Sequence, residues 1–297
     1  TVRHSFPTRR SSDLVAGANG MLGQDLCAVL EAAGHEVTRR DLPELDILEA
    51  EQCLEQVAGH DVVANCAAHT AVDRAEEEEG LAFAINAVGA ANLARAAAAT
   101  GASMVQISTD YVFAGNATQP YAADAPQAPV SAYGRTKAAG EWAVRGLCPQ
   151  SWVVRTAWLY GAAGPTGFPK AMKRLAAARD SLTVVSDQVG QPTWTHDLAE
   201  AIVRLVESEA PYGMWHGTGS GQCSWFDFAR ATFEELGLDP ERVQPITSAE
   251  YAAMYPAAAA RPAYSVLSHE RWEQAGIAPL PEWRDALHRA APTVLAD

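Results

Sequence analysis

The chain has 297 residues, a formal net charge of −14 and a hydrophobic fraction of 48%, enough for a large α/β unit with a smaller appendage. The acidic balance excludes the basic surface that nucleic-acid binding requires, and no apolar run is expected to be long enough to span a membrane. The five cysteines form no C-x-x-C pair, which argues against a disulfide framework or a zinc site and for a cytoplasmic protein.

The first thirteen residues, 1–13, do not resemble the start of a domain. They carry several basic residues, no apolar period and no plan of a signal peptide. The glycine motif that follows needs a buried strand before it, and only the apolar residues 14–16 supply one. We therefore expect residues 1–13 to be a foreign segment that replaces the start of the native first strand. A genuine disordered tail is the alternative.

A glycine-rich loop follows this short strand. Residues 17–23 read G-x-x-G-x-x-G, and a helical pattern over 24–33 and a strand from residue 36 come next. Glycines at these positions let backbone amides approach a pyrophosphate, and the start of the following helix favours negative charge. The pattern alone is equally typical of a plain turn. Its place between a strand and a helix predicts a dinucleotide site formed by Gly17, Gly20 and Gly23.

The next elements alternate in type. Strands are predicted at 61–65, 103–108 and 151–156, and helices at 80–100 and 131–146. This alternation predicts a Rossmann-type, doubly wound parallel sheet over residues 14–160. The pattern loosens from residue 161, where short strands at 182–185 and 213–216 mix with helices at 225–236 and 281–290 and with Pro-rich loops. We interpret 161–297 mainly as a smaller C-terminal α/β lobe that binds substrate, with some segments returning to the first domain.

Charged residues follow the second strand of this unit. Asp41 would hold the 2′-hydroxyl of an adenine ribose, whereas Arg39 and Arg40 would accept a 2′-phosphate. Both kinds of residue are present, so the sequence leaves NADH and NADPH equally open. A solvated charge cluster is the simpler alternative.

Tyr133 and Lys137 lie four residues apart on the predicted helix 131–146, which places both on one face. A neighbouring ammonium lowers the pKa of a phenol, which could then exchange a proton with a carbonyl oxygen. Thr109 follows a buried strand, and its hydroxyl can polarise the same carbonyl. Turn capping would be the simpler role for Thr109 alone. The downstream Tyr/Lys pair favours catalysis.

Two residues further along suggest contacts with a nucleotide. Trp158 could stack on a base or a sugar, although a buried aromatic residue is the simpler interpretation. Arg261 could bind a diphosphate, since a guanidinium matches phosphate oxygens in pairs. His69 follows the strand 61–65, where a structural loop histidine is the simpler alternative.

Several motifs together resemble a known family. The glycine loop, S-T-D-Y-V-F at 108–113 and Y-x-x-x-K at 133–137 are similar to the extended short-chain dehydrogenase/reductases. Within them, A-H-T-A-V-D at 68–73 and D-Q-V-G-Q-P-T at 187–193 resemble the family of dTDP-4-dehydrorhamnose reductases. The resemblance runs from about residue 14 to the end. It implies reduction of the C4 ketone of dTDP-4-dehydro-β-L-rhamnose with NADPH or NADH, the last step of dTDP-L-rhamnose synthesis.

The same resemblance implies roles for individual positions. Tyr133 would protonate the C4 oxygen, Thr109 would hydrogen-bond to that oxygen, and Lys137 would lower the tyrosine pKa and bind the nicotinamide ribose. Asp110 and Trp158 would contact the sugar nucleotide. The cofactor would lie along three groups of positions: Gly20, Met21 and Leu22 at the pyrophosphate, Asp41, Asp46 and Ile47 at the adenosine, and Ala67, Ala68 and Thr70 at its middle.

Some relatives dimerise through magnesium that carboxylates hold. Asp25 matches one such ligand, but His196 stands where a second carboxylate would be expected, so we predict no metal. The expected partner is a dTDP-sugar, with no nucleic acid and no membrane, and the chain would be a monomer or a homodimer.

Two competing functions remain. The first is another nucleotide-sugar epimerase, reductase or dehydratase of the superfamily, although dehydratases typically place Asp-Glu after the catalytic threonine and this chain has Asp110-Tyr111 there. The second is a non-catalytic regulatory subunit like the one that binds methionine adenosyltransferase. The intact Thr109, Tyr133 and Lys137 argue against the second.

Overall fold

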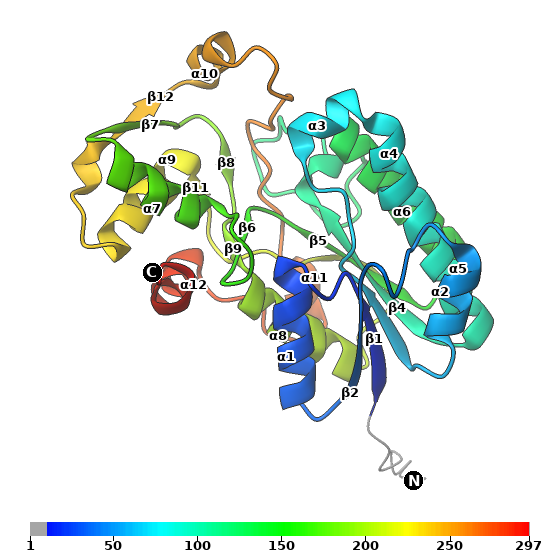
Figure 1. Cartoon of the computed structure of the whole chain (residues 1–297). Helices are drawn as coiled ribbons and strands as arrows, with labels where there is room; N and C mark the ends of the chain where they lie inside the picture. The colour runs from blue at the N-terminus through cyan, green and yellow to red at the C-terminus, as the bar shows by residue number, and fades with distance from the viewer. Residues whose placement is uncertain (1–10, 297) are drawn as a thin grey trace.

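The computed structural model describes residues 11–296, and a six-stranded parallel sheet forms its centre (Figure 1). The spatial order of the strands is β10-β5-β4-β3-β1-β2. This confirms the predicted Rossmann-type doubly wound sheet. The bounds of the strands are β1 Ser12–Ala16, β2 Glu36–Arg40, β3 Val62–Asn65, β4 Ser103–Thr109, β5 Ser151–Thr156 and β10 Gly213–His216.

The strand order reverses beside β1. The chain passes from β1 to β2 on one side and then to β3 on the other side of β1. In open α/β sheets, ligands bind outside the carboxyl ends of the strands at such a switch point. The glycine loop follows β1 and the loop 66–71 follows β3, so both lie at this point.

The first strand is longer than the sequence indicates. Ser12 pairs with Glu36, and Asp13 pairs with Val37 on one side and Val62 on the other. Two residues that the sequence analysis assigns to the leader therefore belong to the central sheet. Residues 1–10 of that leader lie outside the described residues.

Helices cover both faces of the sheet (Figure 1). Alternate residues of β1 point to opposite faces, so Val15 packs with one group of helices and Leu14 with the other. The Val15 face carries α1 Met21–Ala32, α8 Thr195–Glu207 and α11 Glu270–Gln274. The Leu14 face carries α2 Ala50–Val57, α5 Ala90–Thr100 and α6 Ala132–Leu147.

One helical run joins α4 Glu79–Phe83, the π-helix η1 Ala84–Gly89 and α5. By length and composition this run, 79–100, could cross a membrane, which the sequence analysis does not anticipate. However, 61% of its apolar window is buried inside the molecule. It is the core helix that packs against the sheet, α2 and α6.

The C-terminal lobe lies beside the carboxyl ends of the strands (Figure 1). It contains two apolar clusters of its own, one around Phe228 and one around Phe233. Segments α8, β10 and α11 leave the lobe and complete the Rossmann half. The lobe consists of β6 Leu159–Tyr160, α7 Phe168–Ala178, β7 Leu182–Val185, β8 Val189–Gly190, β9 Thr193–Trp194, β11 Cys223–Ser224, α9 Trp225–Glu235, β12 Val243–Ile246, α10 Ser248–Met254 and α12 Trp283–Val294.

Shorter helical turns connect these elements. They are α3 Val72–Glu77 and the 3-10 turns η2 Asp110–Val112 and η3 Pro240–Arg242.

Candidate active site

The glycine loop is shaped by close backbone contacts. Gly17 has φ 76°, and a Cβ atom there would lie 2.5 Å from the Ala67 backbone nitrogen. A Cβ atom on Gly23 would lie 2.2 Å from the Gly17 carbonyl oxygen. Gly20 caps α1, and no side chain of residues 11–296 caps this helix start. The first amides of α1 therefore remain available to a pyrophosphate, and the loop fits the expected dinucleotide.

The end of β2 and the loop after it form the expected adenosine end. Asp41 accepts a hydrogen bond from the Asn19 backbone nitrogen at 2.9 Å, so its carboxylate lies beside the glycine loop. Arg39 pairs with Glu31 at 2.9 Å. Ile47 is buried, and a Cβ atom on Gly89 would lie 2.5 Å from its side chain.

Three further predicted positions behave differently. The Asp46 carboxylate accepts a hydrogen bond from the Leu48 backbone nitrogen at 2.9 Å and shapes the loop. The Leu22 side chain is buried in the core, so only its backbone amide can face a cofactor. Met21 lies near Gly161, at the start of the lobe.

The loop after β3 is held in place by a residue that the sequence analysis misses. Asn86, on η1, accepts a hydrogen bond from the His69 backbone nitrogen at 2.9 Å. Its amide donates to the His69 carbonyl oxygen at 3.1 Å and to the Thr136 hydroxyl at 3.0 Å. In the sequence, the signal for this role was a polar Asn86 among the apolar residues of η1. Along this loop Ala67 and Ala68 are half-buried and Thr70 is exposed.

Thr109 and Tyr133 come together as predicted. The two side chains hydrogen-bond to each other. Thr109 also accepts a bond from the Tyr111 backbone nitrogen at 3.2 Å and donates to the Asp110 carboxylate at 3.0 Å. It therefore caps the turn η2 and contacts Tyr133, so the simpler interpretation and the catalytic one both apply. Ser131 caps α6 by accepting from the Gly134 amide at 3.1 Å, which orients the turn that carries Tyr133.

The expected lowering of the Tyr133 pKa by Lys137 is not what this structure shows. Burial raises the pKa of Tyr133, the hydrogen bond to Thr109 lowers it in part, and the Asp110 carboxylate raises it further. Lys137 acts elsewhere, because its ammonium donates to the Ile107 carbonyl oxygen at 2.7 Å. Burial lowers the pKa of Lys137 to about 8.

Asp110 lies beside this pair and is buried. Burial raises its pKa to about 6, against hydrogen bonds that lower it. The Ser265 hydroxyl lies beside the Asp110 carboxylate and lowers its pKa in part, although no hydrogen bond of normal geometry joins Ser265 Oγ to Asp110 Oδ2. A bound hydroxyl could complete the hydrogen bonds of these two buried atoms.

Trp158 has a strained backbone. Its φ is 48°, in the left-handed region that bulky residues rarely adopt. The ring stacks on Trp225 with centroids 3.6 Å apart, and a Cβ atom on Gly190 would lie 2.6 Å from it. Strain of this kind is held at functional sites more often than elsewhere. Trp225 had no signal in the sequence, since the stack joins residues far apart along the chain.

Arg261 connects the lobe to the first domain. Its guanidinium donates to the Asp73 carboxylate on α3 at 2.9 Å. Arg261 and Trp225 also line a cavity of about 510 Å³ in the lobe. The other walls of this cavity come from α7, β7 and α10.

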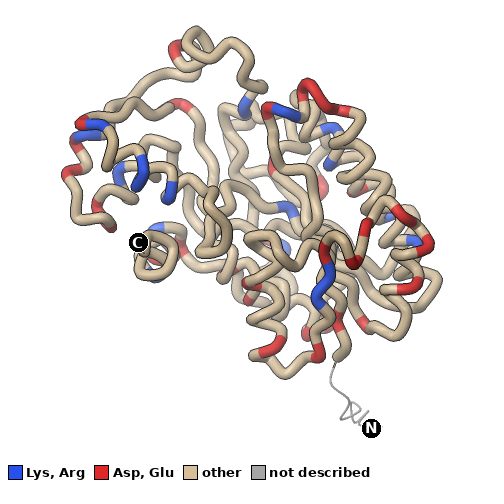
Figure 2. Tube along the Cα trace, in the orientation of Figure 1, with Lys and Arg blue, Asp and Glu red and all other residues tan. Residues whose placement is uncertain are grey.

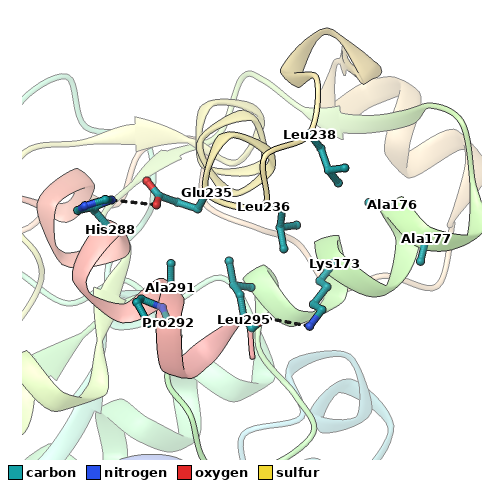
Figure 3. Close-up of a pocket in the computed structure, with 10 residues that line it drawn as sticks. All are labelled: Lys173, Ala176, Ala177, Glu235, Leu236, Leu238, His288, Ala291, Pro292 and Leu295. Carbon is teal, nitrogen blue, oxygen red and sulfur yellow. Dashed lines mark hydrogen bonds and ion pairs between the residues drawn. The ribbon is translucent and has the colours of Figure 1, made fainter. Parts of the chain in front are cut away.

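A second cavity, of about 660 Å³, lies between α7, α9 and α12 (Figure 3). Its titratable groups are engaged: His288 hydrogen-bonds to Glu235 at 3.0 Å, and Lys173 donates to the Leu295 carbonyl oxygen at 2.8 Å. None of the predicted site residues lines it. Size alone therefore does not identify the active site, and the predicted site residues gather instead at the carboxyl ends of β1, β3 and β4.

Comparisons with known proteins show the family of the chain. The family model described as RmlD substrate binding domain matches residues 13–295. The chain is 46% identical to the dTDP-4-dehydrorhamnose reductase of Mycolicibacterium smegmatis, over 95% of this chain and 85% of that protein. It is 45% identical to the dTDP-4-keto-6-deoxy-D-glucose reductase of Streptomyces niveus, over 96% and 98%.

A solved structure is also similar. It is a dTDP-4-dehydrorhamnose reductase from Bacillus anthracis in complex with NADP, with 37% sequence identity and a TM-score of 0.89. The match covers 96% of this chain and 99% of that one.

Proposed function

Because the chain belongs to the RmlD substrate binding domain family, we propose that it reduces the C4 ketone of dTDP-4-dehydro-β-L-rhamnose to dTDP-β-L-rhamnose. The cofactor is NADPH or NADH. The observation that carries the proposal is the Thr109 hydroxyl close enough to Tyr133 to lower its pKa in part, at the same edge of the sheet as a glycine loop whose amides are available to a pyrophosphate. A carbonyl oxygen bound here would accept a hydrogen bond from Thr109 and a proton from Tyr133.

Tyr133 is the proton donor in this proposal. A nicotinamide cofactor, when bound, would supply the hydride for the C4 carbon. Tyr133 gives its proton to the C4 oxygen as negative charge develops there, and Thr109 donates a hydrogen bond to the same oxygen. The raised pKa of Tyr133 keeps the phenol protonated at neutral pH until that charge appears. Lys137, as an ammonium, would hold the ribose of the cofactor, the role that remains because it does not lower the pKa of Tyr133 here.

The lobe would bind the nucleotide end of the substrate. Trp225 joins the stack with Trp158 to the cavity of about 510 Å³, and Arg261 lies at the same cavity. Helix α7 carries Lys and Arg positions (Figure 2), but it lines the cavity with apolar side chains, and the charged residues of the cavity wall are Arg179 and Arg261. Aromatic walls and nearby positive charge suit a base and a diphosphate.

One assay tests the proposal. Purified protein is mixed with NADPH or NADH and dTDP-4-dehydro-L-rhamnose, and nicotinamide absorbance at 340 nm is followed on the order of minutes. We expect turnover and a dTDP-rhamnose product. A folded protein that turns over with neither cofactor would refute the reductase function and would favour the non-catalytic regulatory role.

A second candidate function is reduction of a different dTDP-4-keto-6-deoxy sugar. The relative from Streptomyces niveus, 45% identical, carries such a name. The two functions share Thr109, Tyr133 and Lys137 and differ in how the lobe meets the sugar. Comparing kcat/KM for dTDP-4-dehydro-L-rhamnose and dTDP-4-keto-6-deoxy-D-glucose separates them, and we expect the rhamnose precursor to be preferred.

We also propose that the protein works in the cytoplasm, as a monomer or a homodimer. The described residues hold no group of three metal-ligating side chains, and Asp25 accepts a hydrogen bond from Thr195 at 2.5 Å. Sedimentation with and without a chelator measures the oligomeric state. A dimer that dissociates with the chelator would contradict the prediction of no metal.

A further inference from the structure

A buried ion pair lies beneath the catalytic helix. Glu141 on α6 and Arg155 on β5 have side chains that are 1% and 3% exposed. One edge of the guanidinium binds the carboxylate through two hydrogen bonds, with Nε to Oε1 at 2.9 Å and Nη2 to Oε2 at 2.8 Å. A buried pair contributes less to stability than apolar residues of the same volume often do, so its presence calls for another reason.

The other contacts of the Arg155 guanidinium are with neutral groups. Arg155 donates to the Ala123 carbonyl oxygen at 3.0 Å and lies over the Phe113 ring at 4.8 Å. His216 lies 3.5 Å away and stays neutral, because burial and Arg155 lower its pKa to about 3. Arg155 therefore acts on Glu141 and not on a second carboxylate.

Glu141 reaches the catalytic residues through two neighbours. Its Oε1 accepts a hydrogen bond from the Ser108 hydroxyl at 2.5 Å, and Ser108 directly precedes Thr109. Gln127 donates to its other oxygen. Glu141 also lies one helical turn after Lys137 on the same face of α6. Lys137 in turn is held by the carbonyl of Ile107, on the same strand as Ser108.

The charge of Glu141 also acts on Lys137. Burial lowers the pKa of Lys137 to about 8, and the Glu141 carboxylate is the strongest group that raises it. The Cys66 thiol, at the end of β3, faces Lys137 as well but stays neutral, because burial raises its pKa to about 12. From β4 Lys137 meets an uncharged carbonyl.

We infer that Glu141 is a positioning residue for the reduction: clamped by Arg155, it fixes the Ser108–Thr109 end of β4 and keeps Lys137 in its ammonium form. This inference rests on the proposed role of Lys137 and deepens it. A purely structural pair would need neither the bond to Ser108 nor a place one turn from the lysine.

Glu141→Gln tests the charge while it keeps the shape. Loss of the carboxylate removes the attraction that favours the ammonium, so Lys137 loses its proton at a lower pH. We expect the alkaline limb of the kcat/KM profile to move down by about one pH unit. Activity at about pH 6, where the lysine is still charged, should change little. Glu141→Asp retains the charge and should restore the wild-type limb.

A second measurement isolates the lysine from the tyrosine. In a Tyr133→Phe background there is no phenol, so the pH dependence of NADPH affinity, followed by fluorescence, reports on Lys137. We expect the midpoint of affinity loss to move to lower pH when Glu141→Gln is added. Ser108→Ala removes the hydrogen bond but no charge, and it should lower kcat without moving the midpoint.

A double variant serves as the control for effects on folding. Glu141→Gln alone leaves Arg155 buried without a counter-charge, whereas Glu141→Gln with Arg155→Gln leaves no orphan charge. The double variant should shift the limb in the same direction. A uniform loss of activity with an unmoved limb would refute the inference, and so would a protein that folds only with a carboxylate at 141. If Lys137→Met kept wild-type turnover, the proposed role of Lys137 would fail instead.

Discussion

At the scale of single residues, the raised pKa of Tyr133 agrees with its proposed role in the reductive direction. A donor that held its proton loosely would lose it to solvent before the C4 oxygen became basic. Burial and the Asp110 carboxylate both favour the neutral phenol, and the hydrogen bond to Thr109 aims it. Lys137 has no resolved effect on this pKa, because its ammonium donates to the Ile107 carbonyl oxygen, so its proposed role is to hold the ribose of the cofactor.

Tyr133→Phe should lower kcat by about 10²- to 10⁴-fold, the range that general acid catalysis supplies. The change removes only the hydroxyl, so NADPH affinity should stay nearly constant. Stopped-flow turnover and fluorescence titration measure the two effects. Tyr111→Phe is the matched control, because its ring meets that of Tyr133 edge to face at 5.6 Å. Equal activity in the Tyr133 and Tyr111 variants would show that the proton comes from elsewhere.

The sequence predicts residues whose partners lie close along the chain or whose motif is known. Tyr133 and Lys137 are one helical turn apart, and Thr109 ends a strand with a clear apolar pattern. Asn86, Trp225 and Glu141 could not be assigned, because their roles depend on contacts between elements that the sequence does not pair. The prediction that Lys137 lowers the pKa of Tyr133 was wrong for a related reason. Burial raises this pKa, and burial depends on the whole environment of the phenol.

At the scale of elements, the glycine loop is defined by the approach of two strand ends. Gly17 and Gly34 both have positive φ, 76° and 93°, but only Gly17 lies against a neighbouring backbone. A Cβ atom on Gly34 would meet no atom within 4 Å. Alanine substitutions at Gly34 and Gly17 therefore separate the free-energy cost of a left-handed backbone from the cost of a steric clash.

Gly34→Ala should destabilise the protein by about 1–2 kcal/mol, the cost of a left-handed alanine, and leave cofactor affinity unchanged. Gly17→Ala should cost more and should weaken NADPH binding, because the loop must move away from Ala67. Denaturant unfolding and cofactor titration measure both effects. Similar cofactor affinity in the two variants would show that the loop does not bind the pyrophosphate.

The strand β1 carries a buried Asp13 at a position where central strands are usually apolar. Its carboxylate pairs with His35, which also hydrogen-bonds to Glu207 at 3.2 Å. Burial lowers the pKa of His35, and the two carboxylates more than offset this, so the pKa is raised overall.

A raised pKa makes stability depend on pH. The folded chain holds the His35 proton more tightly than the unfolded chain does, so the contribution is complete below the ordinary pKa of about 6.5. This contribution to the free energy of unfolding disappears as the pH rises through the raised pKa of His35. We expect the unfolding free energy of the wild type to fall relative to His35→Gln between about pH 6 and pH 9. Parallel urea titrations of the two proteins would contradict this if their difference stayed constant.

Several elements of the lobe could not be predicted from local pattern. Strands β6, β8, β9 and β11 are two residues long and exist only through their partners. Helix α7 begins with Phe168-Pro169 after a Gly-rich stretch, which is typical of a loop as well as of a helix start. By contrast β7 and β10 coincide with their predicted ranges, because each is a short apolar run between turn residues.

At the scale of the molecule, the Arg261–Asp73 pair joins the lobe to the Rossmann half above the site. The two side chains are 28% and 54% exposed, so the pair itself stabilises the fold by only about 0–1 kcal/mol. Its place at the cavity with Trp225 suggests that Asp73 aims the guanidinium at the substrate diphosphate.

Arg261→Met should therefore raise KM for the dTDP-sugar by about tenfold, the loss of one charge-assisted contact. The melting temperature and NADPH affinity should change little. Arg230→Met is the matched control, because Arg230 pairs with Glu241 within the lobe, away from this cavity. A KM that rises equally in both variants would indicate a general electrostatic effect.

The path of the chain between the two halves has a consequence for how the molecule unfolds. Leu198 and Ile202 of α8, Trp215 of β10 and Trp272 of α11 share one apolar cluster with Val15. A fragment that ended at residue 160 would expose that face of the sheet and lack its edge strand. The Rossmann half therefore has no complete core without the segments that return to it from the lobe, so we expect this half to unfold together with them as one cooperative unit.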